Sequence, residues 1–278
     1  MQSSREQARL GLQRLCRGLL VNIVALGISV PVLDLISATQ PTATEEISKP
    51  DADILIVGAG IAGLSAALEL ARGGTSVAVI DAFSVFGGHA VVSNGAVSMV
   101  DTPLQRSMKI KDSPEIALRD FIDWGKDANV DWVHYYVQHS RDEVYDWLTQ
   151  MGVVFESVIP HDGNSVARLH LARGKGLGLV SPIYREALRT PNVSFLWNTK
   201  MERLLIEGNR IAGVAAENTR TQTKRELRAK IVILATGGVQ SNLTLVREFW
   251  PKDLPSPARL LLGGGRYATG SGHEAAKQ

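Results

Sequence analysis

The amino-acid sequence predicts an α/β fold in which the strands of a parallel sheet alternate with helices. Residues 53–81 contain a hydrophobic strand, a glycine-rich turn, a helix of small residues and a second hydrophobic strand without interruption, which is the order of a βαβ unit. Short segments of alternating polar and apolar residues follow position 191 and predict a β-meander. A later hydrophobic run, residues 230–234, ends in small residues and predicts another buried strand.

The turn of the βαβ unit has the glycine spacing of a dinucleotide-binding loop. Gly58 permits a sharp turn, Gly60 lets a pyrophosphate approach the backbone, and Gly63 lets the helix pack closely on the strand. Asp81 ends the second strand, where a carboxylate accepts hydrogen bonds from the adenosine ribose. We therefore predict dinucleotide binding by this unit. The expected contacts are Gly58, Ala59, Gly60, Ile61, Ala62, Gly63, Asp81 and Ala82.

Two later glycine segments indicate which dinucleotide binds. Residues 86–100 contain a glycine pair, and residues 230–238 end in A-T-G-G. Together with the first unit, from residue 53 to the end of the chain, they resemble the FAD-binding segments of the fumarate reductase and succinate dehydrogenase flavoprotein family, the FAD-dependent oxidoreductase 2 type, with its urocanate reductases and 3-ketosteroid dehydrogenases. The resemblance implies the three-layer FAD/NAD(P)-binding fold with a parallel Rossmann-like sheet, a β-meander and inserted helices, and FAD as cofactor. It adds contacts from Gly87, Gly88, His89, Ser93, Asn94, Gly95, Ala235, Thr236, Gly237 and Gly270.

His89 follows the glycine pair at a place where the resemblance allows two interpretations. Some members of the family have at this place a histidine that is covalently bonded to FAD, whereas the soluble fumarate reductases have an asparagine. The glycine pair before His89 and the Gly95-Ala96 dipeptide are similar to the non-covalent relatives. We therefore expect non-covalent FAD, with a hydrogen bond from His89 as its contribution.

Composition excludes several other classes of protein. The 278 residues include 30 basic and 28 acidic side chains, and without a basic run with interleaved aromatic residues the sequence gives no support for nucleic-acid binding. Cys16 is the only cysteine, so the chain has no internal disulfide and no cysteine-held zinc or iron–sulfur site. We predict no metal site.

Residues 1–50 differ from the rest of the chain. Arginines at 5, 9, 14 and 17 precede an apolar run, residues 18–33, an order that resembles a secretory signal or a short membrane anchor. A buried or amphipathic helix is the alternative. The first interpretation implies a periplasmic or membrane-associated protein, and the second a cytoplasmic one. Residues 39–50 are polar with flanking prolines and predict a linker, so we divide the chain into residues 1–50 and an FAD-binding domain, residues 51–278.

Helices are predicted between the glycine segments. Ser113, Pro114 and Glu115 are a cap, a first-turn proline and a first-turn acid, and Gly125 can end that helix. Apolar residues at helical spacing predict a second helix over residues 131–151, ended by Gly152. The segments 193–197, 201–207, 210–217 and 224–231 then predict the meander.

Residues 164–178 form a predicted loop with several cations. Arg168 and His170 resemble the R-x-H segment of fumarate reductases, beside the site where flavin and a substrate carboxylate meet. They are our candidate catalytic residues, since cations there suit an anionic substrate. A solvated basic loop is the alternative.

The last residues contain further glycines. Gly263–Gly265, Gly270 and Gly272 resemble the family's turn into a helix near the cofactor. Members of the family continue through a capping domain, so we expect a chain truncated at its C-terminus with the capping domain largely absent. No position of this chain matches the arginine that the resemblance names as proton donor.

The resemblance implies an FAD-dependent oxidoreductase that acts on an activated C=C or CH–CH bond. It implies a small anionic or enone-type substrate and an electron-donor partner. Two alternatives stay open at this point: a truncated flavin-binding module without catalytic activity, and an NAD-binding module. The sequence alone does not choose a substrate.

Overall fold

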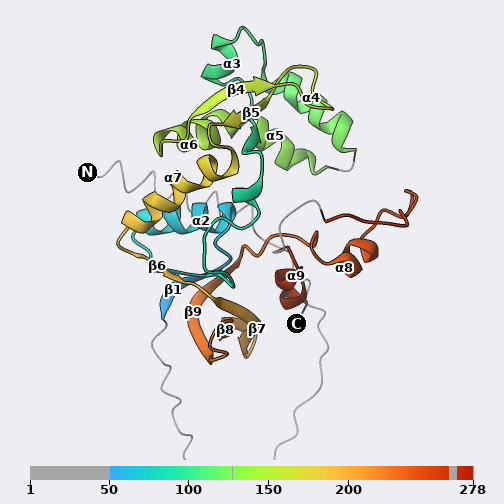
Figure 1. Ribbon diagram of the computed structural model, residues 1–278. Helices are drawn as coiled ribbons and strands as arrows, with labels where there is room; N and C mark the ends of the chain where they lie inside the picture. Colours follow the sequence, from blue (N-terminus) through green and yellow to red (C-terminus); the bar gives the residue numbers. More distant parts are fainter. Residues whose placement is uncertain (1–50, 127, 263–267, 278) are drawn as a thin grey trace, which may run out of the picture. The chain divides into compact units, whose positions relative to one another are not determined.

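The computed structural model describes residues 51–126, 128–262 and 268–277, which all belong to one compact unit, Pro50–Gln278 (Figure 1). The predicted leader and linker, residues 1–50, and the glycines at 263–265 lie outside the described residues. Within these ranges, no helix has the length and apolar character needed to cross a membrane.

A six-stranded sheet organises the unit, in the order β6-β2-β1-β9-β8-β7. Strands β1 (Ala52–Val57), β2 (Val77–Ile80) and β6 (Val193–Leu196) are parallel. Strand β9 (Lys224–Leu234) runs parallel to β1 and antiparallel to β8 (Arg210–Asn218). Strand β7 (Thr199–Glu207) pairs with β8 in the antiparallel sense. The sheet confirms the α/β prediction.

The predicted four-strand meander is wrong in one respect. Its first segment, β6, pairs with β2 at the far edge of the parallel sheet, so the meander consists of β7, β8 and β9. Alternating apolar residues predict a strand but not its partner, because either neighbour would bury the same side chains. The two predicted strands at 224–231 and 230–234 are one continuous strand, β9, which joins the meander to the parallel sheet.

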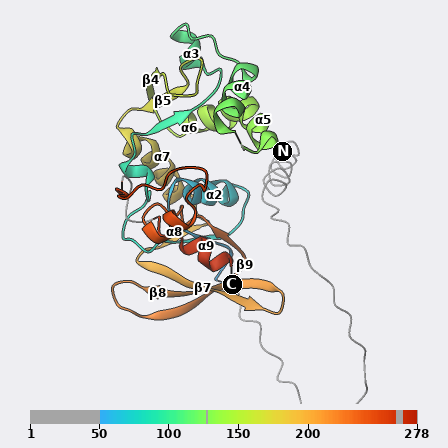
Figure 2. The ribbon, with the colours of Figure 1, turned by 90° about the vertical axis from the view of Figure 1, so that its right-hand side faces the viewer.

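The parallel strands are buried on both faces, which explains their uninterrupted hydrophobic runs. On one face, Ile54 and Ile56 pack with helices α2 (Ile61–Arg72) and α7 (Lys175–Arg189). On the other face, Leu55 and Val57 pack with apolar residues of β7, β8 and β9. Figure 1 and Figure 2 show α2 and α7 above the parallel strands and the strands β7 and β8 below them. The result is the predicted three-layer arrangement of helices, sheet and meander.

A smaller part of the unit lies beyond α2 and α7 (Figure 1). Its antiparallel sheet has the order β3-β5-β4, from β3 (Ala96–Ser98), β5 (Leu169–Ala172) and β4 (Phe155–Ile159). Its helices are α3 (Pro103–Ser107), α4 (Pro114–Gly125), α5 (Val130–His139) and α6 (Trp147–Gln150), with the 3-10 turn η1 (Ala90–Val92) preceding β3 in the chain. The chain ends with α8 (Leu243–Glu248) and α9 (Ser271–Ala276).

The helix predictions have different outcomes. Helix α4 begins as predicted, because the Ser113 hydroxyl accepts a hydrogen bond from the Ile116 N–H at 3.3 Å and Pro114 occupies the first turn. The predicted helix over residues 131–151 is interrupted by a π-helical segment, η2 (Ser140–Asp146). At its start, the buried Ser140 hydroxyl accepts from the Val100 N–H at 3.1 Å, which fixes this segment to the end of β3.

Candidate functional site

A cavity of about 680 Å³ opens at the carboxyl ends of β1, β2 and β9. This edge of a parallel sheet is where dinucleotides bind in doubly wound folds, and the volume is typical of a small-molecule site. Its lining comes from distant parts of the sequence: the glycine loop, the end of β2, the segment after Phe86, the β6–β7 and β8–β9 connections, and the chain that follows β9.

The glycine loop forms one side of the cavity. Gly58 has a φ of +110°, and a Cβ there would lie 2.3 Å from the Ala235 carbonyl oxygen, so only glycine fits. A Cβ on Gly63 would lie 1.9 Å from the Gly58 oxygen, which confirms close packing of helix on strand. A Cβ on Gly60 would meet nothing within 4 Å, because this residue lines the cavity. Helix α2 begins here with no side-chain cap and no acid in its first turn, so its first N–H groups are available to an anion.

Asp81 lies at the end of β2 and lines the cavity. One carboxylate oxygen accepts from the Ala59 N–H at 2.7 Å, and the other accepts from the Phe83 N–H at 2.9 Å. Burial raises the pKa of Asp81 and outweighs these two hydrogen bonds, which lower it. Each oxygen keeps a further lone pair, so the carboxylate can also accept from a ligand hydroxyl.

The segment that contains the glycine pair lies beside the glycine loop. The Gly87 N–H donates to the Ala59 oxygen at 2.7 Å, and Gly87 forms an isolated parallel bridge with Gly60. His89 follows at the start of η1 and lines the cavity. This contact between two glycine segments brings the His89 side chain to the same cavity as the first turn of α2.

The chain after β9 lies beside the glycine loop and also lines the cavity. The Ala235 N–H donates to the Val57 oxygen at 2.8 Å, which continues the pairing with β1. The Thr236 hydroxyl oxygen accepts from the Gly272 N–H at 3.1 Å, so the start of α9 is held against this turn. The predicted turn into a helix at Gly270 is therefore present, with α9 beginning at Ser271.

The predicted cofactor residues divide into two groups. Twelve line the cavity: Gly58, Gly60, Ile61, Ala62, Asp81, Ala82, Gly87, Gly88, His89, Ala235, Thr236 and Gly237. Six do not: Ala59, Gly63, Ser93, Asn94, Gly95 and Gly270. At position 95 close packing requires glycine, because a Cβ on Gly95 would lie 2.3 Å from the Lys175 carbonyl carbon. The Ser93 hydroxyl donates to the Ala90 oxygen and accepts from the Gly95 N–H, which stabilises the turn after η1.

Sequence reasoning missed the end of the cavity beyond Asp81. They come from the turn after β2, from the β6–β7 connection with the start of β7, and from the β8–β9 connection, and no motif in the sequence marks these segments. The missed residues at this end are Phe83, Ser84, Asn198, Thr199, Lys200, Met201, Thr219 and Arg220.

The two candidate catalytic residues lie elsewhere. Arg168 and His170 are both fully buried and absent from the lining of the cavity, so the solvated-loop interpretation does not hold for these two residues. The reason is local structure: residues 169–172 form the central strand β5 of the smaller sheet, and α7 begins at Lys175. A strand between two neighbours turns alternate side chains into the interior.

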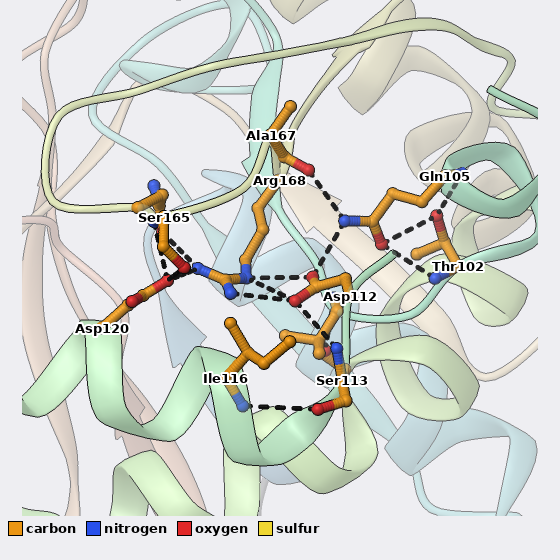
Figure 3. A network of polar contacts seen from close by, with 12 residues as sticks. Thr102, Gln105, Asp112, Ser113, Ile116, Asp120, Ser165, Ala167 and Arg168 are labelled. Carbon is orange, nitrogen blue, oxygen red and sulfur yellow. Dashed lines mark hydrogen bonds and ion pairs between the residues drawn. The ribbon is translucent and has the colours of Figure 1, made fainter. Parts of the chain in front are cut away.

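Arg168 is held by carboxylates of its own chain (Figure 3). Its guanidinium donates to Asp112 through Nε and Nη2, at 2.9 and 2.8 Å, and to Asp120 through Nη1 at 2.5 Å. Asn164 accepts a fourth bond at 2.9 Å. Burial raises the pKa of Asp120, but hydrogen bonds from Ser165 and Arg168 outweigh it and lower the pKa overall. These bonds use four of the five guanidinium N–H groups and hold the side chain in the buried network, outside the lining of the cavity.

His170 joins the same network through Thr102. Its Nδ1 lies 2.6 Å from the Arg168 carbonyl oxygen, which can only accept, so Nδ1 carries the proton. Its Nε2 then accepts from the Thr102 hydroxyl at 2.6 Å. Burial lowers the pKa of His170, in agreement with a neutral ring.

The FAD binding domain model matches residues 53–278 of this chain. The chain belongs to this family. The match begins at the first strand of the βαβ unit and includes every described residue that lines the cavity.

Two curated relatives show the range of the family. The chain is 34% identical to a KsdD-like steroid dehydrogenase of Mycobacterium tuberculosis, an alignment that covers 77% of this chain and 43% of the relative. It is 32% identical to a cytochrome fumarate reductase of Shewanella frigidimarina, over 72% of this chain and 35% of the relative. The chain therefore spans less than half the length of either relative.

A comparison of three-dimensional structures leads to the same family. A flavocytochrome c3 fumarate reductase in its open conformation superimposes with a TM-score of 0.72 at 26% identity, over 81% of this chain and 40% of that one. Among the residues that the structure describes, no group of three or more His, Cys, Asp or Glu side chains is placed to hold a metal ion.

Proposed function

We propose that this chain binds FAD non-covalently and supplies the cofactor domain of an oxidoreductase that acts on a C=C or CH–CH bond. One observation carries the proposal: the uncapped N-terminus of α2 and the Asp81 carboxylate face one cavity of about 680 Å³. A pyrophosphate needs the first of these groups and a ribose diol needs the second.

The residues present fit FAD in type and order. The first N–H groups of α2 hold the pyrophosphate, and Asp81 accepts from the ribose hydroxyls. His89 and the 235–238 turn also line the cavity, and we assign to them the orientation of the flavin half. Bound FAD supplies hydride chemistry, and the contribution of this chain is to position the cofactor.

The substrate is the least determined part of the proposal. The relatives named above are a steroid dehydrogenase and a fumarate reductase, so we propose a small enone-type or anionic substrate. The reaction of these flavoproteins also requires a partner that exchanges electrons with the cofactor, which we propose is external to the described residues. Because the chain covers 43% and 35% of these relatives, substrate and partner belong to the protein as a whole.

An absorbance spectrum of the purified chain tests cofactor binding. The protein is incubated with FAD, desalted and scanned through the near-ultraviolet and blue flavin bands. Flavin that stays with the native protein supports the proposal. A sample that retains no flavin, and shows none in an equilibrium titration, would contradict it and favour the NAD-binding alternative, which a parallel titration with NADH tests.

The same sample decides between covalent and non-covalent flavin. After unfolding in acid and precipitation, yellow colour in the supernatant supports non-covalent binding. Colour that stays in the pellet, and disappears from the pellet of a His89→Ala variant, assigns the bond to His89.

A flavin-binding module without turnover is the second candidate. It is favoured by the burial of Arg168 and His170 outside the lining of the cavity, which leaves none of the candidate catalytic residues from the sequence in that lining. Dithionite-reduced protein mixed with fumarate, urocanate or a 3-ketosteroid distinguishes the two. Reoxidation by one of them supports the oxidoreductase, and no reoxidation by any supports the module.

A further inference from the structure

The end of the cavity beyond Asp81 is a wall made from three separate segments. They are the turn after β2, the β6–β7 connection and the tip of the β8–β9 hairpin. The Asn198 N–H donates to the Phe83 oxygen at 2.9 Å, and the Thr219 N–H donates to the Asn198 oxygen at 2.7 Å. The Thr219 hydroxyl donates to the Ala82 oxygen at 3.1 Å, which links the hairpin tip directly to the turn after β2. The wall is therefore fixed by hydrogen bonds that do not depend on any ligand.

Arg220 lies on the cavity side of this wall. Its Nη2 donates to the Ser84 hydroxyl at 2.8 Å, and that hydroxyl donates to the Asn198 side-chain oxygen at 2.8 Å. The backbone N–H of Arg220 donates to the Asn218 side chain at 3.0 Å, which fixes the turn that carries it. These bonds fix the guanidinium at the cavity wall, and Arg220 is exposed.

The charge of Arg220 is not compensated inside the described part of the chain. No acidic side chain there forms an ion pair with Arg220, whose guanidinium donates to the neutral Ser84 hydroxyl. Lys200, which also lines the cavity, differs because it pairs with Glu202 at 2.9 Å. An uncompensated guanidinium costs little at an exposed site and suits a ligand with negative charge or a π-face.

The order of groups along the cavity decides between these two kinds of ligand. The pyrophosphate belongs at the start of α2 and the adenosine ribose at Asp81. The base of a nucleotide extends from the ribose away from the pyrophosphate, so it meets the wall that contains Ser84 and Arg220.

We propose that Arg220 stacks on the adenine ring of the dinucleotide and selects FAD over FMN. The inference rests on the proposed cofactor site. The guanidinium supplies a planar cation for the base, and Ser84 and Asn198 hold it in place. FMN has no adenosine half and gains nothing from this contact.

Isothermal titration of wild-type and Arg220→Ala protein with FAD, FMN and ADP tests the proposal. We expect the variant to bind FAD and ADP about 5- to 30-fold more weakly, as the loss of a cation–π contact predicts, and to bind FMN unchanged. Arg225→Ala is the matched control. Arg225 is an exposed arginine of the same hairpin that lines a separate cavity of about 350 Å³ instead, and its loss should change none of the three affinities.

Two results would overturn the proposal. Equal FAD and ADP affinities in wild type and Arg220→Ala would show that the base does not contact Arg220. A loss for ADP that Arg220→Lys restores in full, and that high salt abolishes, would assign the effect to phosphate charge and not to stacking. ADP also separates this inference from cofactor binding in general: ADP affinity that depends on Arg220 supports it even if the chain fails to retain FAD.

Discussion

The cavity and the buried network use the same types of residue for opposite purposes. In the network, Arg168 donates four hydrogen bonds to Asp112, Asp120 and Asn164, and it is fully buried. In the cavity, Asp81 faces a space that it shares with Arg220, and neither is neutralised by an ion pair among the described residues. A charged side chain that is paired inside the protein is occupied by its own chain, whereas one without an ion pair can bind a ligand. Asp81 and Arg220 are therefore better candidates for a functional role than Arg168.

The largest expected effect comes from removing the centre of the network. Arg168→Ala leaves two carboxylates in the interior, with side chains 0% and 10% exposed, without their cation. Breaking a buried pair in this way costs about 3–5 kcal/mol. Urea denaturation measures it.

The control is Arg173→Ala. Arg173 is 69% exposed and pairs with Glu156 at 3.5 Å, so its loss should change the free energy of unfolding by less than about 1 kcal/mol. Similar values for the two variants would mean that burial does not distinguish the network from a surface ion pair. Loss of FAD binding in Arg168→Ala under conditions where it is still folded would return Arg168 to the candidate site.

One part of the cavity could be predicted because its residues lie in one short segment of the sequence. The run from Gly58 to Asp81 is one βαβ unit, in which Gly58 and Gly63 have the steric roles, and Gly60 the open approach, that their spacing indicates. The A-T-G-G turn was recognisable for a related reason, since it ends a hydrophobic strand.

The rest depended on tertiary partners, which residue type does not reveal. Arg168 has the composition of an anion-binding residue, and only the distant Asp112 and Asp120 make it structural. Conversely, Arg220 is one cation in a polar hairpin, and only the pairing of β7, β8 and β9 brings it to the end of β2. The edge position of β6 could not be predicted for the same reason, because it depends on pairing with the distant strand β2.

The second prediction tests the cavity side of the comparison. Burial raises the pKa of Asp81, so the contribution of this carboxyl group to stability is present below its unfolded value of 3.8 and is lost as the pH rises through the higher folded value. At neutral pH, Asp81→Asn should therefore leave the ligand-free domain as stable as wild type or slightly more stable. FAD affinity should fall about 10- to 100-fold, since a charged hydrogen-bond acceptor for the ribose is lost.

Thermal melting measures the stability of the ligand-free protein, and FAD titration of the same samples measures the affinity for the cofactor. A variant that melts several degrees lower and binds FAD normally would place Asp81 with Arg168 as a structural charge, and the distinction between the two regions would fail.

The smallest expected effect concerns His170, which lies at the edge of the network around Arg168. Burial lowers the pKa of His170 below its usual 6.5, so the folded state holds fewer protons than the unfolded state between the two values. Stability from this residue is then present above pH 6.5 and is lost as the pH falls toward the lower folded value, by at most about 1.4 kcal/mol per pH unit. Urea denaturations at several pH values between 7.5 and 5.0 measure the slope of the free energy of unfolding against pH. His170→Gln should remove the part of this slope that comes from His170 and leave the part that comes from other groups. If wild type and variant keep the same slope, the folded and unfolded states bind the His170 proton equally, and the network does not hold this ring neutral.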